Sequence, residues 1–269
     1  MRLIKFILCT FPFILLYNFI AGDMKKSTVL VCYGKLRPET IKGYDYVILE
    51  SKHYLPSNIR VIKSQNEKVF AYISLGEVNA HAPHYDALKN NTLGKNEIWN
   101  SYYIDLRSPK TIEILMKIIE STFQKGYDGL FLDNVDNFTI HGPQKNQKAE
   151  FLDLLKKMKA KYPKKQFLQN AGLEIAAETA PYIDAIAVES IASNYDFKNK
   201  KYRLRDKKQY EEFMAKAQSV SQKHKVHLFL IEYSNSLSLN QKIAERIKDS
   251  GFDYFIGNID LQTLPKFKE

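Results

Sequence analysis

The sequence predicts an α/β protein built as a single (β/α)8 TIM barrel, and three observations lead to this fold. The chain has 269 residues, close to the roughly 250 residues of a typical barrel of this kind. Eight short apolar runs alternate with helical patterns, which is the order of βα units around a parallel sheet. Most of these runs are continuous rather than alternating, as in strands covered on both faces. Eight such strands fit a closed barrel better than an open sheet.

The predicted strands are rich in Val, Ile, Leu, Phe and Tyr, the residues that favour extended structure. They span residues 28–34, 44–50, 69–77, 128–133, 166–172, 184–189, 227–234 and 253–258. Helical patterns occupy residues 109–126, 148–162, 207–224 and 239–251. The first of these has the clearest boundaries, because Ser108 is a candidate N-cap, Pro109 takes the first helical position and Gly126 is a natural stop.

A weak internal repeat supports the barrel. Four times an Asp opens a predicted strand, and a carboxylate or amide closes it five residues later: Asp45 and Glu50, Asp128 and Asp133, Asp184 and Glu189, Asp253 and Asn258. The opening Asp can cap backbone N–H groups. The closing residue would lie at the C-terminal ends of the strands, where TIM barrels carry their active sites. We therefore interpret the opening Asp as structural and the closing residue as functional.

The N-terminal segment differs from the rest of the chain. Arg2 and Lys5 precede an apolar run that covers residues 6–21, and polarity returns at Asp23. This order is typical of a secretory signal peptide, and the run is short for a membrane span of about 20 residues. We expect a signal peptide at 1–22, with an uncleaved anchor as the alternative, and one barrel domain at 28–269. The expected protein is a secreted or periplasmic (cell-envelope) monomer, which would meet a membrane only through an uncleaved signal.

Composition and missing motifs exclude several function classes. The formal net charge is +10, but lysines are spread along the chain and the densest basic cluster covers only residues 198–208. Nucleic-acid binding therefore has little support. The six histidines lack partner cysteines, and no dinucleotide or phosphate-binding glycine loop is present. Asp133, Asn134 and Asp136 lack the further ligands of a calcium loop. We expect neither a metal nor a cofactor.

Polar residues at the strand ends are carboxylates, amides and phenols, which suit a polyhydroxylated ligand. Hydrolysis of a glycosidic bond typically needs two carboxyl groups. Asp133 ends the fourth predicted strand and Glu189 the sixth, so both are candidates for a catalytic pair. Two alternatives stay open, an N-cap role for Asp133 and a buried ion pair for Glu189. The substrate-binding candidates are Tyr33, Glu77, Asn134, Asp136, Asn170, Glu232 and Asn258.

Several segments resemble, in the right order, the barrel domain of glycoside hydrolase family 114, the endo-α-1,4-polygalactosaminidase family. They are YISLGE (72–77), YYIDL (102–106), GYDGLFLDNVD (126–136), QNAG (169–172) and AVES (187–190). The resemblance covers roughly residues 28–260. It implies an extracytoplasmic barrel enzyme that cleaves α-linked polysaccharide containing galactosamine or N-acetylgalactosamine. It also implies Asp133 as nucleophile and Glu189 as acid/base, and hence retention of anomeric configuration.

The leading hypothesis is therefore a secreted glycoside hydrolase with a polysaccharide substrate. The alternative is a non-catalytic carbohydrate-binding or envelope-assembly protein on the same barrel. That alternative predicts a plugged barrel mouth, with Asp133 or Glu189 neutralised by a buried lysine. The enzyme hypothesis instead requires that both carboxylates reach the open end of the barrel.

Overall fold

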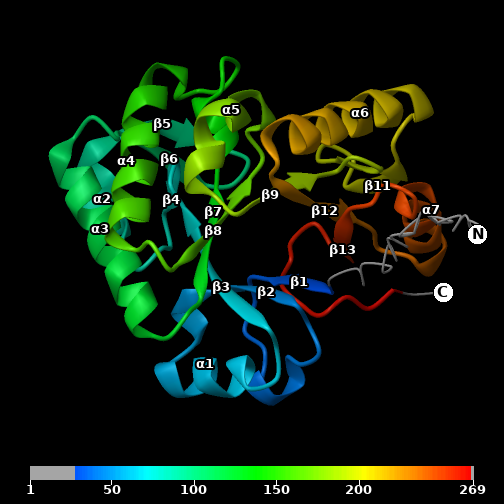
Figure 1. The fold of residues 1–269 in the computed structure, drawn as a ribbon, viewed down its shortest axis with the longest axis horizontal. Coiled ribbons are helices and arrows are strands. Elements are labelled where there is room, and N and C mark those ends of the chain that lie inside the picture. Colours follow the sequence, from blue (N-terminus) through cyan, green and yellow to red (C-terminus); the bar gives the residue numbers. More distant parts are fainter. Residues whose placement is uncertain (1–27, 268–269) are drawn as a thin grey trace, which may run out of the picture.

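The computed structural model describes residues 28–267, so the predicted signal peptide at 1–22 lies outside the described residues. Eight parallel strands form one sheet in the order β1-β2-β3-β7-β8-β9-β12-β13 (Figure 1). Their bounds are Val29–Cys32, Tyr46–Glu50, Lys68–Ser74, Gly129–Asp133, Gln166–Asn170, Ala185–Glu189, His227–Tyr233 and Asp253–Gly257. A bridge between Thr28 and Tyr254 joins the last strand to the first. The barrel is nearly closed, and the predicted (β/α)8 fold is confirmed.

Seven α-helices are found in residues 28–267, and the longer ones cover the outside of the barrel (Figure 1). They are α1 (Pro56–Lys63), α2 (Tyr85–Leu88), α3 (Pro109–Gln124), α4 (Lys148–Lys161), α5 (Ala176–Thr179), α6 (Lys207–His224) and α7 (Leu237–Ile247). The predicted start of α3 is confirmed, because the Ser108 side chain accepts a hydrogen bond from the Thr111 N–H. None of these helices is long and apolar enough to cross a membrane.

Two additions to the barrel were not predicted from the sequence. After β3, the strands β4 (Glu77–Asn79), β5 (Thr92–Asn96) and β6 (Ser101–Ile104) form a small antiparallel sheet. After β9, the strands β10 (Ser193–Asp196) and β11 (Lys201–Leu204) form a hairpin. The predicted strand at 69–77 is therefore two strands, since β3 ends at Ser74 and Glu77 begins β4. Both additions follow the C-terminal ends of barrel strands, on the side where a barrel carries its active site.

The opposite end of the barrel is held by the opening aspartates. Three of them accept a hydrogen bond from a backbone N–H of the neighbouring strand: Asp45 from Thr28 at 3.0 Å, Asp128 from Val69 at 2.9 Å and Asp184 from Phe167 at 2.8 Å. The fourth, Asp253, lies 3.0 Å from Nε2 of His227. Three glycines that precede these aspartates, Gly43, Gly126 and Gly251, have φ of 82°, 104° and 79°, a conformation that glycine adopts without steric cost. The structural role inferred for the opening Asp is confirmed.

Replacement of Asp128 by Ala tests this role. The change leaves the Val69 N–H without its carboxylate acceptor and removes the ion pair with Lys63, which measures 2.6 Å. We expect the free energy of unfolding to fall by about 1–3 kcal/mol, the usual effect of leaving one buried donor unpaired. Urea denaturation measures this change. Asp86→Ala is the control, because it removes only an exposed ion pair with Lys89; an equal loss in both variants would contradict the capping role.

Candidate functional site

The candidate site lies at the ends of three neighbouring strands, where Asp133, Asn170 and Glu189 are the last residues of β7, β8 and β9. The residue after each of them has a left-handed backbone, with φ of 60° at Asn134, 61° at Ala171 and 57° at Ser190. This conformation is uncommon outside glycine, costs about 1–3 kcal/mol and concentrates at functional sites. Three neighbouring strands are thus each followed by a residue in this uncommon conformation, which is a pattern typical of a functional site.

One amide nitrogen joins the two predicted catalytic carboxylates. Nδ2 of Asn170 donates to Oδ1 of Asp133 at 2.8 Å and to Oε1 of Glu189 at 2.6 Å. Only the amide nitrogen can make both contacts, because a carboxylate oxygen accepts hydrogen bonds and does not donate them. The two carboxylate oxygens can therefore be no farther apart than two hydrogen bonds placed end to end. Asn170 is itself buried, so its position is fixed by the protein around it.

A tyrosine from a flanking strand contacts each carboxylate on its other oxygen. The Tyr72 hydroxyl on β3 donates to Oδ2 of Asp133 at 2.8 Å, and the Tyr233 hydroxyl on β12 donates to Oε2 of Glu189. Burial, followed by the nearby carboxylate charges, raises the pKa of both phenols well above the usual value. Both hydroxyls therefore keep their protons and remain donors. Each carboxylate is thus oriented by one phenol and by the shared amide.

Both residues of the pair keep contact with solvent. Glu189 as a whole residue is exposed and Asp133 is half-buried, although protein atoms surround the carboxyl group of Glu189. Within residues 28–267, no ion pair links either of them to a lysine or arginine. The helical turn that follows β7 (Val135–Phe138) has Asn134 at its N-cap position. Neither the ion pair considered for Glu189 nor the N-cap considered for Asp133 is observed.

Local electrostatics favours the protonated form of Glu189. Enclosure by the surrounding protein raises the pKa of Glu189, and the negative charge of Asp133 raises it further. The hydrogen bonds from Tyr233 and Asn170 act in the opposite direction but do not outweigh these effects. The protein atoms around the carboxyl group of Asp136, and then the charge of Asp133, raise the pKa of that carboxyl in the same direction, although the residue as a whole keeps contact with solvent. Glu189 therefore holds a proton to higher pH than an ordinary glutamate.

Besides Asn170, three further predicted substrate-binding residues lie beside this pair. The Tyr33 ring packs against the Tyr72 ring, with centroids 4.6 Å apart, and the charges of both carboxylates help to raise the pKa of its phenol. Oδ1 of Asn134 accepts a hydrogen bond from the Ser74 hydroxyl at 2.5 Å. Asp136 is exposed and near enough for its charge to act on Glu189. The structure thus brings Tyr33, Asn134 and Asp136 together with the pair.

Glu77 lies in a buried network next to the site. Its carboxylate accepts hydrogen bonds from Nδ2 of Asn137 at 3.0 Å, from Nδ2 of Asn96 at 3.3 Å and from the Ser101 hydroxyl. Only 6% of its surface is exposed. Because the donors come from β5, β6 and the turn after β7, Glu77 ties these three segments together. In this position it supports the architecture around Asp133.

The two remaining predicted residues, Glu232 and Asn258, share no hydrogen bond with the pair among the described residues. Glu232 is fully buried and accepts from the backbone N–H groups of Ala192 at 2.8 Å and Ser193 at 2.7 Å, so a ligand has no access to it. Asn258 follows β13, and within the described part of the chain its Oδ1 is buried without a hydrogen-bond partner. Glu232 therefore anchors the start of β10, whereas Asn258 retains an unused acceptor.

Sequence reasoning missed the contribution of Tyr72. Tyr72 lies within the predicted strand at 69–77, from which only Glu77 was taken as a site candidate. A usable signal was present, because a buried tyrosine hydroxyl normally finds a hydrogen-bond partner. Tyr72 also shares a strand face with Ser74, since side chains alternate along a strand. Tyr233 lies near the end of the predicted strand at 227–234 and is one of the phenols at the strand ends, but its contact with Glu189 was not predicted.

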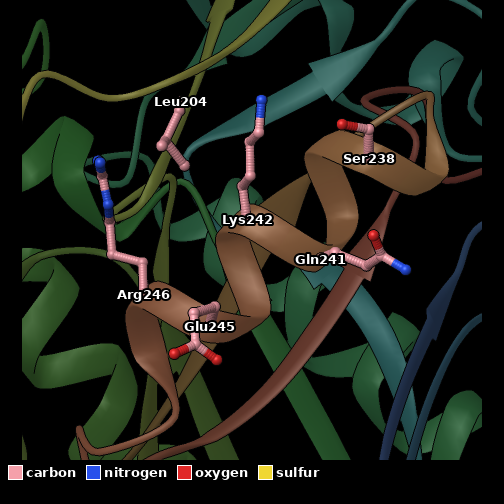
Figure 2. Close-up of a pocket in the computed structure, with 6 residues that line it drawn as sticks. All are labelled: Leu204, Ser238, Gln241, Lys242, Glu245 and Arg246. Atoms are coloured by element: carbon pink, nitrogen blue, oxygen red, sulfur yellow. The ribbon is translucent and has the colours of Figure 1, made fainter.

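A surface hollow lies away from the strand-end carboxylates. A hollow of about 450 Å³ lies between β11 and α7, lined by Leu204, Ser238, Gln241, Lys242, Glu245 and Arg246 (Figure 2). None of the strand-end carboxylates of the barrel lines this hollow. Across residues 28–267, no group of three or more His, Cys, Asp or Glu side chains is arranged to hold a metal ion.

Comparison with known proteins finds a matching family and similar solved structures. The chain matches the family described as glycoside-hydrolase family GH114 over residues 29–268. It is 25% identical to the glycoside hydrolase domain of PelA from Pseudomonas aeruginosa, with a TM-score of 0.78 over 89% of this chain and 98% of that one. It is 19% identical to Aspergillus fumigatus Ega3, whose structure contains galactosamine, with a TM-score of 0.70 over 90% and 94% of the two chains. The second likeness establishes the shared fold only. No curated protein matches.

Two substitutions should move the pKa of Glu189 in opposite directions. Asp133→Asn removes the nearby negative charge, so the pKa should fall towards that of an ordinary glutamate. Tyr233→Phe removes a donor that favours the ionised form, so the pKa should rise. Both shifts can be followed by NMR titration of glutamate labelled with ¹³C at the side-chain carboxyl. Asp86→Asn, a change at an exposed residue, is the control; shifts of the same sign in the two test variants would contradict this account.

Proposed function

The chain belongs to glycoside-hydrolase family GH114, and from this premise we propose that it cleaves a galactosamine-containing polysaccharide with Asp133 and Glu189 as its catalytic carboxyl groups. One observation carries the proposal: both carboxylates share the amide of Asn170. Two carboxyl groups on either side of the scissile bond are the usual requirement for glycoside hydrolysis. The tyrosine contact on each carboxylate fits the fixed geometry that such a reaction needs.

In the first step, an oxygen of Asp133 attacks the anomeric carbon of the sugar. Glu189 donates its proton to the glycosidic oxygen as the bond to the leaving sugar breaks. The product is a glycosyl ester on Asp133 and a free chain end with a new hydroxyl group. The raised pKa of Glu189 supports its role as proton donor, because the group must enter this step protonated.

In the second step, water replaces Asp133 at the anomeric carbon. Glu189, now ionised, takes a proton from the attacking water, and the ester bond to Asp133 breaks. Two displacements at one carbon retain its configuration. The hydrogen-bond lengths of 2.8 and 2.6 Å to the shared amide support this course. They limit the nearest carboxylate oxygens to a separation no greater than two hydrogen bonds end to end, which excludes the roughly 6.5–9.5 Å of inverting enzymes and agrees with the closer pair, about 5–5.5 Å apart, of retaining enzymes.

The choice of an amino sugar rests on local charge as well as on the family. Asp133 and Asp136 lie close enough for their charges to act on each other, and in residues 28–267 neither of them is paired with a lysine or arginine. These two carboxylates attract the protonated amine of galactosamine at contact distance, while Glu189 holds its proton for the first step. The net charge of +10 acts from farther away, and physiological salt screens exposed charges beyond about 8 Å. The local attraction therefore dominates once the sugar is bound.

The non-catalytic alternative has less support. It requires a carboxylate neutralised by a buried lysine, whereas neither Asp133 nor Glu189 has such a partner within the described chain and both reach solvent. We propose an extracytoplasmic location for the enzyme, on the basis of the signal-like segment at 1–22.

Loss of either carboxyl group should abolish cleavage. Asp133→Asn removes the nucleophile and Glu189→Gln removes the proton donor, and each should lower kcat by about 10²- to 10⁴-fold. Reducing ends released from a partly deacetylated α-1,4-galactosamine polymer measure the activity. The thermal midpoint of both variants should stay close to that of the parent, because neither residue is part of the apolar core.

Asp86→Asn changes an exposed residue that forms an ion pair with Lys89, and this variant should keep full activity. NMR spectra recorded during the first turnovers should show the α-anomer at the new reducing end, as retention at an α-linkage requires. Full activity of the Asp133 or Glu189 variant would contradict the assignment of the pair. Release of the β-anomer would contradict only the retaining course.

A further inference from the structure

The chain exposes its single tryptophan. Trp99 lies in the turn between β5 and β6, and 51% of its surface is exposed. Phe197, in the turn between β10 and β11, is 49% exposed. Large apolar side chains are normally buried, so an exposed pair invites a functional explanation. The two rings touch edge to face, with centroids 5.5 Å apart and an angle of 89° between their planes. We call this contact the aromatic bridge.

The aromatic bridge spans the part of the barrel that holds the catalytic pair. The β5–β6 turn belongs to the segment after β3, and the β10–β11 hairpin follows β9. Between β3 and β9 in the barrel lie only β7 and β8, the strands that end in Asp133 and Asn170. Two segments from either side of the site thus meet through Trp99 and Phe197.

Hydrogen bonds connect both segments that carry the aromatic bridge with the surroundings of Asp133 and Glu189. On the first side, Asn96 and Ser101 bind Glu77, which Asn137 joins to the turn directly after Asp133. On the second side, the Ser193 hydroxyl accepts from the backbone N–H of Tyr233 at 2.9 Å. The hydroxyl of the same tyrosine donates to Glu189. The aromatic bridge is therefore continuous with the catalytic site and is not an isolated surface patch.

We propose that Trp99 and Phe197 form an additional sugar-binding subsite, which holds a ring of the polysaccharide away from the bond being cut. This inference rests on the proposed function, since the occupant is the same amino-sugar polymer. One face of a pyranose ring carries C–H groups and packs well on an aromatic ring. A protonated amine is also attracted to the electron-rich face of an aromatic ring, most strongly to that of tryptophan.

Besides the exposed apolar side chain of Ile98, the aromatic bridge has exposed amides nearby, and these suit a sugar as its ligand. Asn100 follows Trp99 directly, and Asn194 lies on β10, three residues before Phe197; both amides are exposed. Amides near an aromatic platform can donate to and accept from sugar hydroxyls and fix their orientation. The subsite would act on long chains, because only a polymer can reach the aromatic bridge while another of its rings lies at Asp133.

Fluorescence offers a direct test, because Trp99 is the only tryptophan in the chain. The full-length Glu189→Gln variant, which should not cleave, is titrated with a partly deacetylated α-1,4-galactosamine polymer and, separately, with monomeric galactosamine. Calorimetry on the same samples measures binding independently of the fluorescence. We expect the polymer to shift or quench the emission in step with binding. The monomer should leave the emission unchanged.

Kinetics provides a second readout. Trp99→Leu and Phe197→Leu keep an apolar side chain but remove the aromatic face, and we expect each to raise KM for the polymer about five- to tenfold. Trp99→Phe should raise it less, since it retains a ring. The effect should fall on KM rather than on kcat, because these residues do not touch the reacting atoms. Val61→Ala, at a partly exposed site on α1, is the control and should leave both constants unchanged.

The outcomes separate this inference from the proposed function. Polymer that binds by calorimetry without changing the Trp99 emission, together with an unchanged KM in both leucine variants, would overturn the subsite and leave the enzyme intact. A loss of kcat equal to the change in KM would also overturn it, because the bridge would then act by positioning the catalytic loops. A wild-type protein that neither binds nor cleaves the polymer would overturn both proposals.

Discussion

The candidate site depends on one neutral donor placed between two acids. The amide of Asn170 holds Asp133 and Glu189 together although their charges repel. This contact requires three strands in a particular register. Asn170 follows Gln169, which pairs with Leu132 on β7, and Asn170 itself pairs with Ala187 on β9. Since strand side chains alternate, Ala187 and Glu189 share a face, and the stagger of the barrel brings all three polar ends together.

The two ends of the barrel divide the polar residues between stability and chemistry, and the sequence predicted much of this division. Each repeat unit combines an apolar run with an Asp before it and a polar residue after it, a local pattern that is visible without a structure. The backbone contacts of Asp45, Asp128 and Asp184 agree with the structural part of that interpretation. The eight strands were predictable for the same reason, because their apolar runs are continuous and buried.

The two additions to the barrel, the small sheet of β4, β5 and β6 and the β10–β11 hairpin, could not be predicted in this way. The residues of β5 (TLGKN) and β10 (SNYD) include no apolar run, and most of β5 is exposed. Long-range contacts hold both additions in place, through the buried carboxylates Glu77 and Glu232. Both acids are satisfied by amide, hydroxyl and backbone donors rather than by cations, as buried polar groups must be. From the sequence, the position of Glu77 and Glu232 near strand ends predicted that they bind a ligand. In the structure they bind donors that are distant in sequence, which indicates that they stabilise the fold around the site.

The proposed mechanism couples the two catalytic groups through charge. While Asp133 is ionised, its charge helps to raise the pKa of Glu189 and keeps the proton in place for the first step. Once Asp133 becomes part of the glycosyl ester, that charge is gone. The pKa of Glu189 then falls, and the group is better suited to remain ionised and accept a proton from water in the second step. The fixed contact through Asn170 matters because this coupling weakens as the two carboxylates move apart. The geometry that positions the two acids thus also sets when Glu189 gives its proton and when it takes one back.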